Sequence, residues 1–247
     1  AMGGELLDDL VAFSTDHDLS GIEALSAIPG TVGAAPVQNV GAYGQEIAQV
    51  LDSVYVFDML NEEFVTIDAK DMDLGYRHSI FNEGDNVGRY LIVSIKIHLN
   101  HGTLKPPFYT SLQSYVESHG ITDFSPKSIR YMVTEIRWSK LPKPEEYASS
   151  GSFFKNVYLD DQEADRLRAQ NVPVWEGNKV PSGWLIDHAG LKGKVFHGMR
   201  VSEKAALILI NESAECYAHL QLAKDEIVSI IKEKYGLTLQ QEPVELE

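Results

Sequence analysis

The segment SGSFFKN, residues 150–156, places Ser152 directly before two phenylalanines and a Lys-Asn pair. A serine hydroxyl can serve as a nucleophile or as a proton donor. Ser152 lies in no G-x-S-x-G turn and has no base next to it in sequence, so an acyl-transfer role is unsupported. Two interpretations stay open. Either the phenylalanines fill a core and the rest is a turn, or Ser152 is held beside a buried reacting centre.

Two glycine-rich stretches, IPGTVG (28–33) and NVGAYG (39–44), are candidates for phosphate binding. The backbone N–H groups of such loops can form an anion-binding nest. Neither stretch matches the P-loop or the G-x-G-x-x-G dinucleotide fingerprint. Glycine spacing alone therefore does not identify a ligand here.

Arg137, Lys140, Lys143 and Lys155 follow one another in a chain that is otherwise acidic. The net charge of −15, from 21 Lys and Arg against 36 Asp and Glu, disfavours nucleic acid and anionic membranes as partners. The four cations either solvate the end of a helix or converge on a phosphate group.

Metal and thiol chemistry find little support in the sequence. The eight histidines show no H-E-x-x-H spacing, and the acidic triplets at 16–18 and 71–73 are predicted to be isolated on the surface, so no metal site is predicted. The single cysteine, Cys216, excludes an internal disulfide and indicates a reducing compartment. We expect Cys216 to be buried or half-buried.

The first hundred residues are predicted to be α+β with antiparallel pairing. Apolar spacing predicts a helix over 5–13, and alternation predicts a hairpin of strands 53–60 and 64–67 with a third strand at 90–99. The stretch 21–44 has too many glycines and prolines for a regular element and is too apolar for a flexible linker. It should be an ordered loop packed against other elements.

An amphipathic helix is predicted within residues 125–144, because Ile129, Met132, Val133 and Ile136 stand at i, i+3, i+4 and i+7. Ser125 is its predicted N-cap, Pro126 takes its first position and Pro142 ends it. The stretch 142–151 is the candidate domain boundary. The remaining predicted elements are helices at 160–170, 182–190 and 217–236, the last ended by Gly236, and strands at 205–210 and 237–247. No apolar run approaches the ~18 residues that span a bilayer.

Six blocks, in order, resemble the bacterial UDP-N-acetylenolpyruvoylglucosamine reductases from about residue 5 to the C-terminus. They are residues 21–44, GYRHSIF (75–81), KLPKP (140–144), SGSFFKN (150–156), GWLIDHAGLKG (183–193) and ALILIN (206–211). The resemblance implies an α+β fold. A flavin domain of the vanillyl-alcohol-oxidase and MurB type would cover 1–147, and an α+β substrate domain would cover 148–247, with the ligand where they meet.

The resemblance also implies the reaction of peptidoglycan synthesis that this family performs. FAD, reduced by NADPH, would reduce UDP-N-acetylglucosamine enolpyruvate to UDP-N-acetylmuramate, in a cytoplasmic monomer. Three residues would be catalytic: Ser152 as proton donor, and Arg77 and Glu242 as stabilisers of the enolate, with Glu242 holding a proton.

Further site residues are implied only by the same resemblance. The substrate-binding set would be Tyr76, Tyr109, Arg137, Lys140 and Asn156. The cofactor-binding set would be Pro29, Gly30, Thr31, Val32, Gly33, Asn39, Gly41, Ala42, Tyr43 and Arg77.

The chain departs from the family pattern in two places. His197 and Met199 stand where the family has smaller residues. The family also has a further part of the flavin domain before the first helix of this sequence. We therefore expect weak FAD binding by this polypeptide alone, which a stoichiometric flavin absorption band would contradict. Two alternatives stay open: a UDP-sugar-binding module without redox activity, and a different flavin oxidoreductase of the superfamily.

Overall fold

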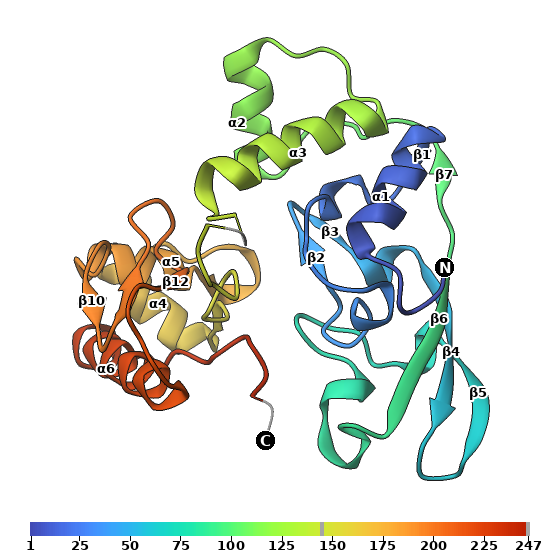
Figure 1. The fold of residues 1–247 in the computed structure, drawn as a ribbon. Helices are drawn as coiled ribbons and strands as arrows, with labels where there is room; N and C mark the ends of the chain where they lie inside the picture. Colours follow the sequence, from blue (N-terminus) through green and yellow to red (C-terminus); the bar gives the residue numbers. More distant parts are fainter. Residues whose placement is uncertain (144–145, 246–247) are drawn as a thin grey trace. The chain divides into compact units, whose positions relative to one another are not determined.

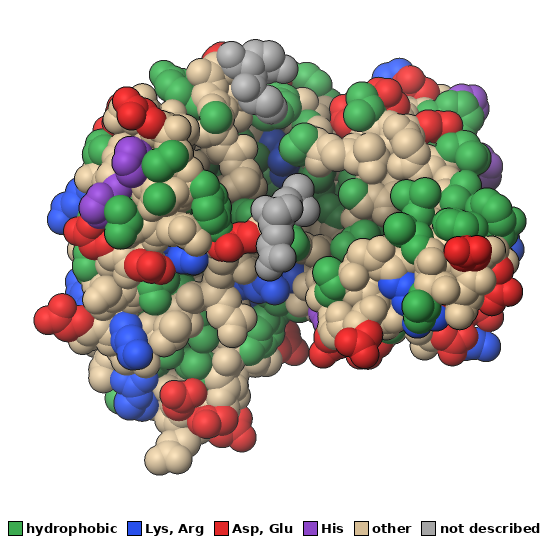
Figure 2. Space-filling view, turned by 60° about the horizontal axis from the view of Figure 1, so that its bottom comes forward, with side chains coloured by type: hydrophobic (Ala, Val, Ile, Leu, Met, Phe, Trp, Pro, Cys, Tyr) green, Lys and Arg blue, Asp and Glu red, His purple; other side chains and the backbone are tan. Residues whose placement is uncertain are grey.

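The structure, a computed structural model, describes residues 1–143 and 146–245. The contacts of the chain divide it into two compact units, Ala1–Ser139 (unit 1) and Lys140–Glu247 (unit 2). Part of the expected boundary stretch, residues 144 and 145, lies outside the described residues. Charged side chains are scattered over the face drawn in Figure 2, with acidic and basic groups interspersed.

The centre of unit 1 is an antiparallel sheet in the order β5-β4-β6 (Figure 1). It consists of β4 (Leu51–Asp58), β5 (Glu63–Asp68) and β6 (Tyr90–Ile97), and Val56 of β4 pairs with both Val65 and Ile92. The side chains of Val54 and Val56 are buried, because alternate residues of a strand face the same side. The predicted hairpin and third strand are confirmed.

The chain before this sheet is largely irregular but well packed. It contains α1 (Leu7–Asp16), β1 (Leu19–Ser20), β2 (Gly41–Ala42), β3 (Gln45–Glu46) and the 3₁₀ turns η1 (Glu23–Leu25), η2 (Val32–Ala34) and η3 (Ile47–Gln49). Ile22, Leu25 and Val32 are fully buried in one core with α1 and the sheet. The prediction of an ordered loop over 21–44 is confirmed.

The rest of unit 1 is three 3₁₀ turns, a short strand and two helices. These are η4 (Ala69–Asp71), η5 (Ile80–Asn82), η6 (Gly84–Asn86), β7 (Asn100–His101), which pairs with β1, α2 (Thr110–His119) and α3 (Pro126–Lys140). The Oγ atom of Ser125 accepts the N–H of Ser128 at 3.3 Å, which confirms the predicted N-cap of α3. The buried face of α3 packs with α2 in a separate small core.

Unit 2 is a second mixed α/β unit with its own core. Its elements are β8 (Val157–Tyr158), α4 (Asp161–Ala169), η7 (Glu176–Asn178), β9 (Lys179–Val180), α5 (Ser182–His188), β10 (Val195–Phe196), β11 (Met199–Val201), β12 (Leu209–Asn211) and α6 (Tyr217–Tyr235). The strands form an antiparallel sheet β10-β11-β12 and a pair β8-β9. Gly236 ends α6 with φ of 76°, as predicted.

Two expectations for unit 2 need correction. Of the predicted strand at 205–210, the last two residues belong to β12, Ile208 makes a single bridge to Ser152, and residues 206 and 207 form a turn. The predicted strand at 237–247 is wrong for its described residues, because a single bridge between Phe154 and Gln241 replaces a ladder.

Among the described helices, none is long and apolar enough to cross a membrane.

Candidate active site

Arg77 lies on a tight turn of unit 1 that is closed by its own backbone. Gly75 and His78 exchange N–H to carbonyl bonds of 3.1 and 3.2 Å, and the N–H of Ile80 donates to Met72 at 2.8 Å. Arg77 adopts φ of 54°, a conformation that only the surrounding bonds can hold in a residue with a side chain. Its Nη2 donates to the carbonyl of Gly41 at 3.2 Å, so the guanidinium reaches the 41–44 loop.

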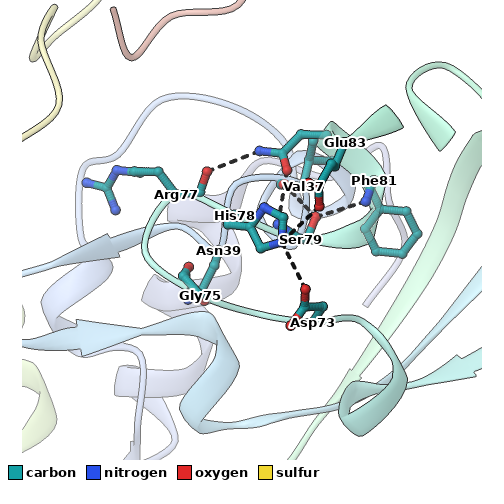
Figure 3. A network of polar contacts seen from close by, with 10 residues as sticks. Val37, Asn39, Asp73, Gly75, Arg77, His78, Ser79, Phe81 and Glu83 are labelled. Carbon is teal, nitrogen blue, oxygen red and sulfur yellow. Dashed lines mark hydrogen bonds and ion pairs between the residues drawn. The ribbon is translucent and has the colours of Figure 1, made fainter. Parts of the chain in front are cut away.

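Ser79 and Asn39 fasten this turn to the preceding loop (Figure 3). The buried Ser79 hydroxyl donates to the carbonyl of Val37 at 2.6 Å and accepts the N–H of Phe81 at 3.1 Å. The Asn39 amide nitrogen donates to Gly75 and to Glu46, both at 2.9 Å, and its oxygen accepts the N–H of Ala48. The amide of Asn39, a predicted cofactor contact, is buried, and its bonds to the protein hold the turn in place.

The tip of the β2–β3 hairpin brings Tyr43, Tyr109 and Arg137 together from three separate stretches. The rings of Tyr43 and Tyr109 meet edge to face with centroids 6.1 Å apart. A Cβ built on Gly44 would lie 3.8 Å from that of Tyr109, and Tyr43 packs against the α2–α3 core that contains Arg137's helix. Three predicted ligand contacts are therefore gathered within unit 1.

Arg137 is a cation with an unmet hydrogen-bonding demand. Burial lowers the pKa of its guanidinium, and nearby Tyr43 and Asp8 oppose that shift. Burial raises the pKa of the Tyr43 hydroxyl, and Arg137 opposes it. The Nε atom of Arg137 is buried without a hydrogen-bond partner among the described residues. A buried donor of this kind is stabilised by an anionic ligand that accepts from it.

The 28–33 loop offers less to an anion than its glycines suggest. The N–H groups of Val32 and Gly33 already donate to the carbonyls of Glu5 and Gly3, both at 2.9 Å. A Cβ on Gly33 would lie 3.1 Å from two carbonyl oxygens, so glycine is required there by packing. Gly30 differs, because its φ is 121° and no atom lies within 4 Å of a built Cβ. Only Gly30 of these three leaves room for a ligand beside the backbone.

The other predicted contacts of unit 1 are placed as follows. Pro29 is exposed, Thr31 caps η2 through its hydroxyl, and Ala42 is half-buried in β2. The Tyr76 ring lies under the Arg77 guanidinium, 5.2 Å from centroid to Cζ. Lys140, which is the last residue of α3 and the first of unit 2, is exposed, as is Lys143.

In unit 2, the SGSFFKN segment is held by its neighbours on both sides. Ser152 bridges to Ile208, and the N–H of Phe153 donates to Leu207 at 2.8 Å. Phe153 and Phe154 are 2% and 1% exposed, with rings 5.1 Å apart, and both belong to the core. The phenylalanines thus fill a core while Ser152 stays half-buried at its edge.

The same segment brings Ser152 next to Glu242 along the backbone. The N–H of Glu242 donates to the carbonyl of Phe153 at 2.9 Å, and the N–H of Lys155 donates to Gln240 at 2.8 Å. Ser152 is therefore next in sequence to Phe153, the residue to which the C-terminal stretch is bonded. Both Ser152 and Glu242 are half-buried.

Asn156 is oriented by the start of α5. Its Oδ1 accepts the N–H of Ser182 at 3.1 Å, and the Ser182 hydroxyl donates to the carbonyl of Lys155 at 2.6 Å. Ser182 is fully buried, so it fixes the backbone of both residues. The sequence gave no sign of Ser182, because its partners are 26 and 27 residues away.

Three further expectations can now be compared with the structure. His197 pairs with Glu226 at 3.1 Å, and Met199 is buried in the core of unit 2. Cys216 is exposed, so the expectation of a buried or half-buried thiol is wrong. Asp73 is not isolated, because it contacts His78 at 3.2 Å. The triplet at 71–73 gave no hint of this, since His78 follows at a spacing that matches no metal motif.

Comparisons with known proteins agree on one family. Residues 143–246 match the family described as UDP-N-acetylenolpyruvoylglucosamine reductase, C-terminal domain. The reductase of that name from Alcanivorax borkumensis is 36% identical over 242 residues, covering 96% of this chain and 70% of the relative. The Pseudomonas aeruginosa reductase is 34% identical over 249 residues, covering 98% and 73%.

A solved structure shows that the fold is shared. The Thermus caldophilus UDP-N-acetylenolpyruvylglucosamine reductase superposes with a TM-score of 0.62 at 22% identity. The match covers 96% of this chain and 68% of that one.

Proposed function

Because the chain belongs to the UDP-N-acetylenolpyruvoylglucosamine reductase family, we propose that it reduces UDP-N-acetylglucosamine enolpyruvate to UDP-N-acetylmuramate in peptidoglycan synthesis. The reaction adds a hydride and a proton across the enol double bond. The hydride goes to the terminal vinyl carbon, and the proton goes to the carbon that bears the carboxylate. NADPH is the proposed source of the hydride and FAD the proposed carrier.

Supporting this proposal, unit 1 has features suited to a ligand with phosphate groups. The orphaned Nε of Arg137 and the open space beside Gly30 both accommodate an anionic group against the chain. Gly30, Ala42, Tyr43 and Arg77 would contact FAD, and Tyr109 and Arg137 would contact the diphosphate of the substrate. When bound, FAD would supply the redox chemistry that no side chain provides.

The adjacency of Ser152 and Glu242 carries the mechanistic part of the proposal. Addition of hydride leaves negative charge on the carboxylate-bearing carbon and its carboxylate. The Arg77 guanidinium and the carboxylic acid group of Glu242 would stabilise that charge by donating hydrogen bonds to it, a contribution that is usually the largest single one in such sites. Ser152 would then give its hydroxyl proton to the carbon.

A weak acid suffices at Ser152 because the acceptor is a strongly basic carbanion. What matters is a fixed position, and the segment supplies it through the bonds to Leu207 and Glu242 and the buried ring of Phe153. Asn156, oriented by Ser182, and Lys140 would bind the UDP-sugar. The remaining predicted contacts, Pro29, Thr31, Val32, Gly33, Asn39 and Gly41, would shape the cofactor loops rather than bind through side chains.

The direct test measures NADPH oxidation by the purified protein supplied with FAD. Oxidation should depend on added UDP-N-acetylglucosamine enolpyruvate, and mass spectrometry should find UDP-N-acetylmuramate in equal amount. The exposed Ser150 offers a matched control for the substitution Ser152→Ala, and Ser150→Ala should keep full activity. Binding of the UDP-sugar without any oxidation would contradict the proposal and favour the binding-module alternative.

A further inference from the structure

The turn that carries Arg77 also gathers three metal-ligating side chains, Asp73, His78 and Glu83. Nε2 of His78 lies 3.2 Å from Oδ2 of Asp73 and 3.3 Å from Oε2 of Glu83. The three donor atoms all lie within 4.8 Å of one another. Figure 3 shows the three side chains turned toward one another, while the Arg77 side chain points away from them.

We propose that Asp73, His78 and Glu83 bind one divalent transition-metal ion of the Zn²⁺ class. One imidazole and two carboxylates are donors that such ions accept, and water would complete the coordination. The site is separate from the proposed reduction. A bound ion would clamp the two ends of the turn that holds Arg77.

The spacing of the donor atoms fits this kind of ion. With metal–ligand bonds of about 2.1 Å, two ligands of a tetrahedral ion lie about 3.4 Å apart. Both distances from His78 are close to that value. The two carboxylate side chains are 81% and 70% exposed, so they can rotate to bring their own oxygens closer.

The backbone holds these ligands close before any ion binds. His78 is fixed by its paired bonds with Gly75, and Ser79, next to it, is buried and bonded to Val37. Asp73 follows the fully buried Met72, whose carbonyl accepts the N–H of Ile80. Little chain entropy remains to be lost at these two positions when a cation binds.

The local charge also favours a cation. Among the described residues, His78 is the only basic side chain within 4 Å of either carboxylate. A divalent ion would balance both negative charges. The Asp52 carboxylate in β4 provides a contrast, because it already contacts both Lys96 and His98 at 3.0 Å. Because basic side chains already contact that carboxylate, the Asp52 cluster serves as the control.

The test is a calorimetric titration of the whole protein with ZnCl₂ at neutral pH. The unchanged protein should bind one Zn²⁺ at this site, and His78→Gln and Asp73→Asn should each weaken that binding at least about tenfold. The control His98→Gln should bind as the unchanged protein does. Because the ligands must be deprotonated, binding should also weaken as the pH is lowered.

A melting experiment gives a second readout that does not depend on activity. Zn²⁺ should raise the melting temperature of the unchanged protein and of His98→Gln, and should not raise that of Glu83→Gln. Because Glu83 is exposed, its replacement should leave the fold intact, and this variant keeps the test valid if His78→Gln folds poorly. The proposal would be overturned if the unchanged protein bound no Zn²⁺, or if His78→Gln and Asp73→Asn bound Zn²⁺ as tightly as the unchanged protein does.

Discussion

The turn at 73–83 in unit 1 and the SGSFFKN segment in unit 2 carry two of the three proposed catalytic residues, Arg77 and Ser152, and different side chains hold them. The turn is closed by backbone bonds and anchored by the polar side chains of Ser79 and Asn39, whose bonds to Val37 and Gly75 join it to the preceding loop. The segment is fixed by backbone bonds and by Phe153 and Phe154, which are buried in the core. The side chains that hold the turn form directional hydrogen bonds, whereas the side chains that hold the segment are buried apolar rings.

The same contrast extends to the units as a whole. Among the described residues, five carboxyl groups have a pKa lowered by their surroundings, and four of them, Asp8, Asp16, Asp52 and Asp58, belong to unit 1. Unit 2 contributes only Glu245 to that set. Unit 1 should therefore respond to pH and to loss of single hydrogen bonds, and unit 2 to loss of buried volume.

The largest effect should come from removing a buried ring in unit 2. Phe154→Ala should lower the free energy of unfolding by about 3 to 5 kcal/mol, because it leaves a cavity in a closed core. Denaturant unfolding followed by the fluorescence of Trp175 and Trp184 measures this. Val195→Ala, at a half-exposed position in the same unit, should change it by less than about 0.5 kcal/mol. If both substitutions changed the free energy of unfolding equally, unit 2 would not depend on its buried rings as described.

Ser79→Ala should have the next largest effect, and in unit 1. The substitution leaves the carbonyl of Val37 and the N–H of Phe81 without their hydrogen-bond partner. This should lower the free energy of unfolding by about 1 to 3 kcal/mol. Because the turn positions Arg77, kcat should fall more than KM rises. Ser114→Ala on the exposed face of α2 is the control. Rescue of kcat by Ser79→Thr would support a positioning role, whereas unchanged kinetics in Ser79→Ala would contradict it.

The smallest expected effect is a loss of folding stability as the pH is lowered. The bonds from Arg89 and from the N–H groups of Leu60 and Asn61 hold the pKa of Asp58 far below its ordinary value of 3.8, although burial opposes this. A lowered folded-state pKa gives stability that is present above the unfolded value and is lost as the pH falls through the folded one. Unit 1 should therefore lose stability progressively below about pH 4.

Hydrogen exchange at descending pH measures this loss separately in each unit. Exchange in β4 and β6 should accelerate before exchange in α6 does. Asp58→Asn should flatten the dependence in unit 1, and Asp85→Asn, an exposed control, should not. Simultaneous loss of protection in both units would show that the ion pairs do not set the acid response.

Much of the secondary structure could be predicted because its signals are local. The spacing of Ile129, Met132, Val133 and Ile136 predicted the buried face of α3, and Gly236 predicted the end of α6. The helix α2 was not predicted, because only Leu112 and Val116 of its ten residues are buried and the periodicity is brief.

The candidate site was harder to predict, because its support comes from distant residues. The contacts of Ser79 with Val37 and of Ser182 with Asn156 join positions 42 and 26 residues apart, and no local pattern marks such partners. The C-terminal stretch is predicted to be a strand, but its described residues make one bridge, from Gln241 to Phe154. Ser152 and Glu242 are predicted as site residues only through the resemblance to a family, and the fold joins Glu242 to Phe153, the neighbour of Ser152, by a backbone bond.

The role of Ser152 is tested most directly by the two half-reactions of Ser152→Ala, followed by flavin absorbance. Reduction of the flavin by NADPH should proceed as in the unchanged protein. Reoxidation by UDP-N-acetylglucosamine enolpyruvate should slow by about 10²- to 10⁴-fold, because the carbon would lack its proton donor. Equal slowing of both half-reactions, or reoxidation at the rate of the unchanged protein, would contradict the assignment of Ser152.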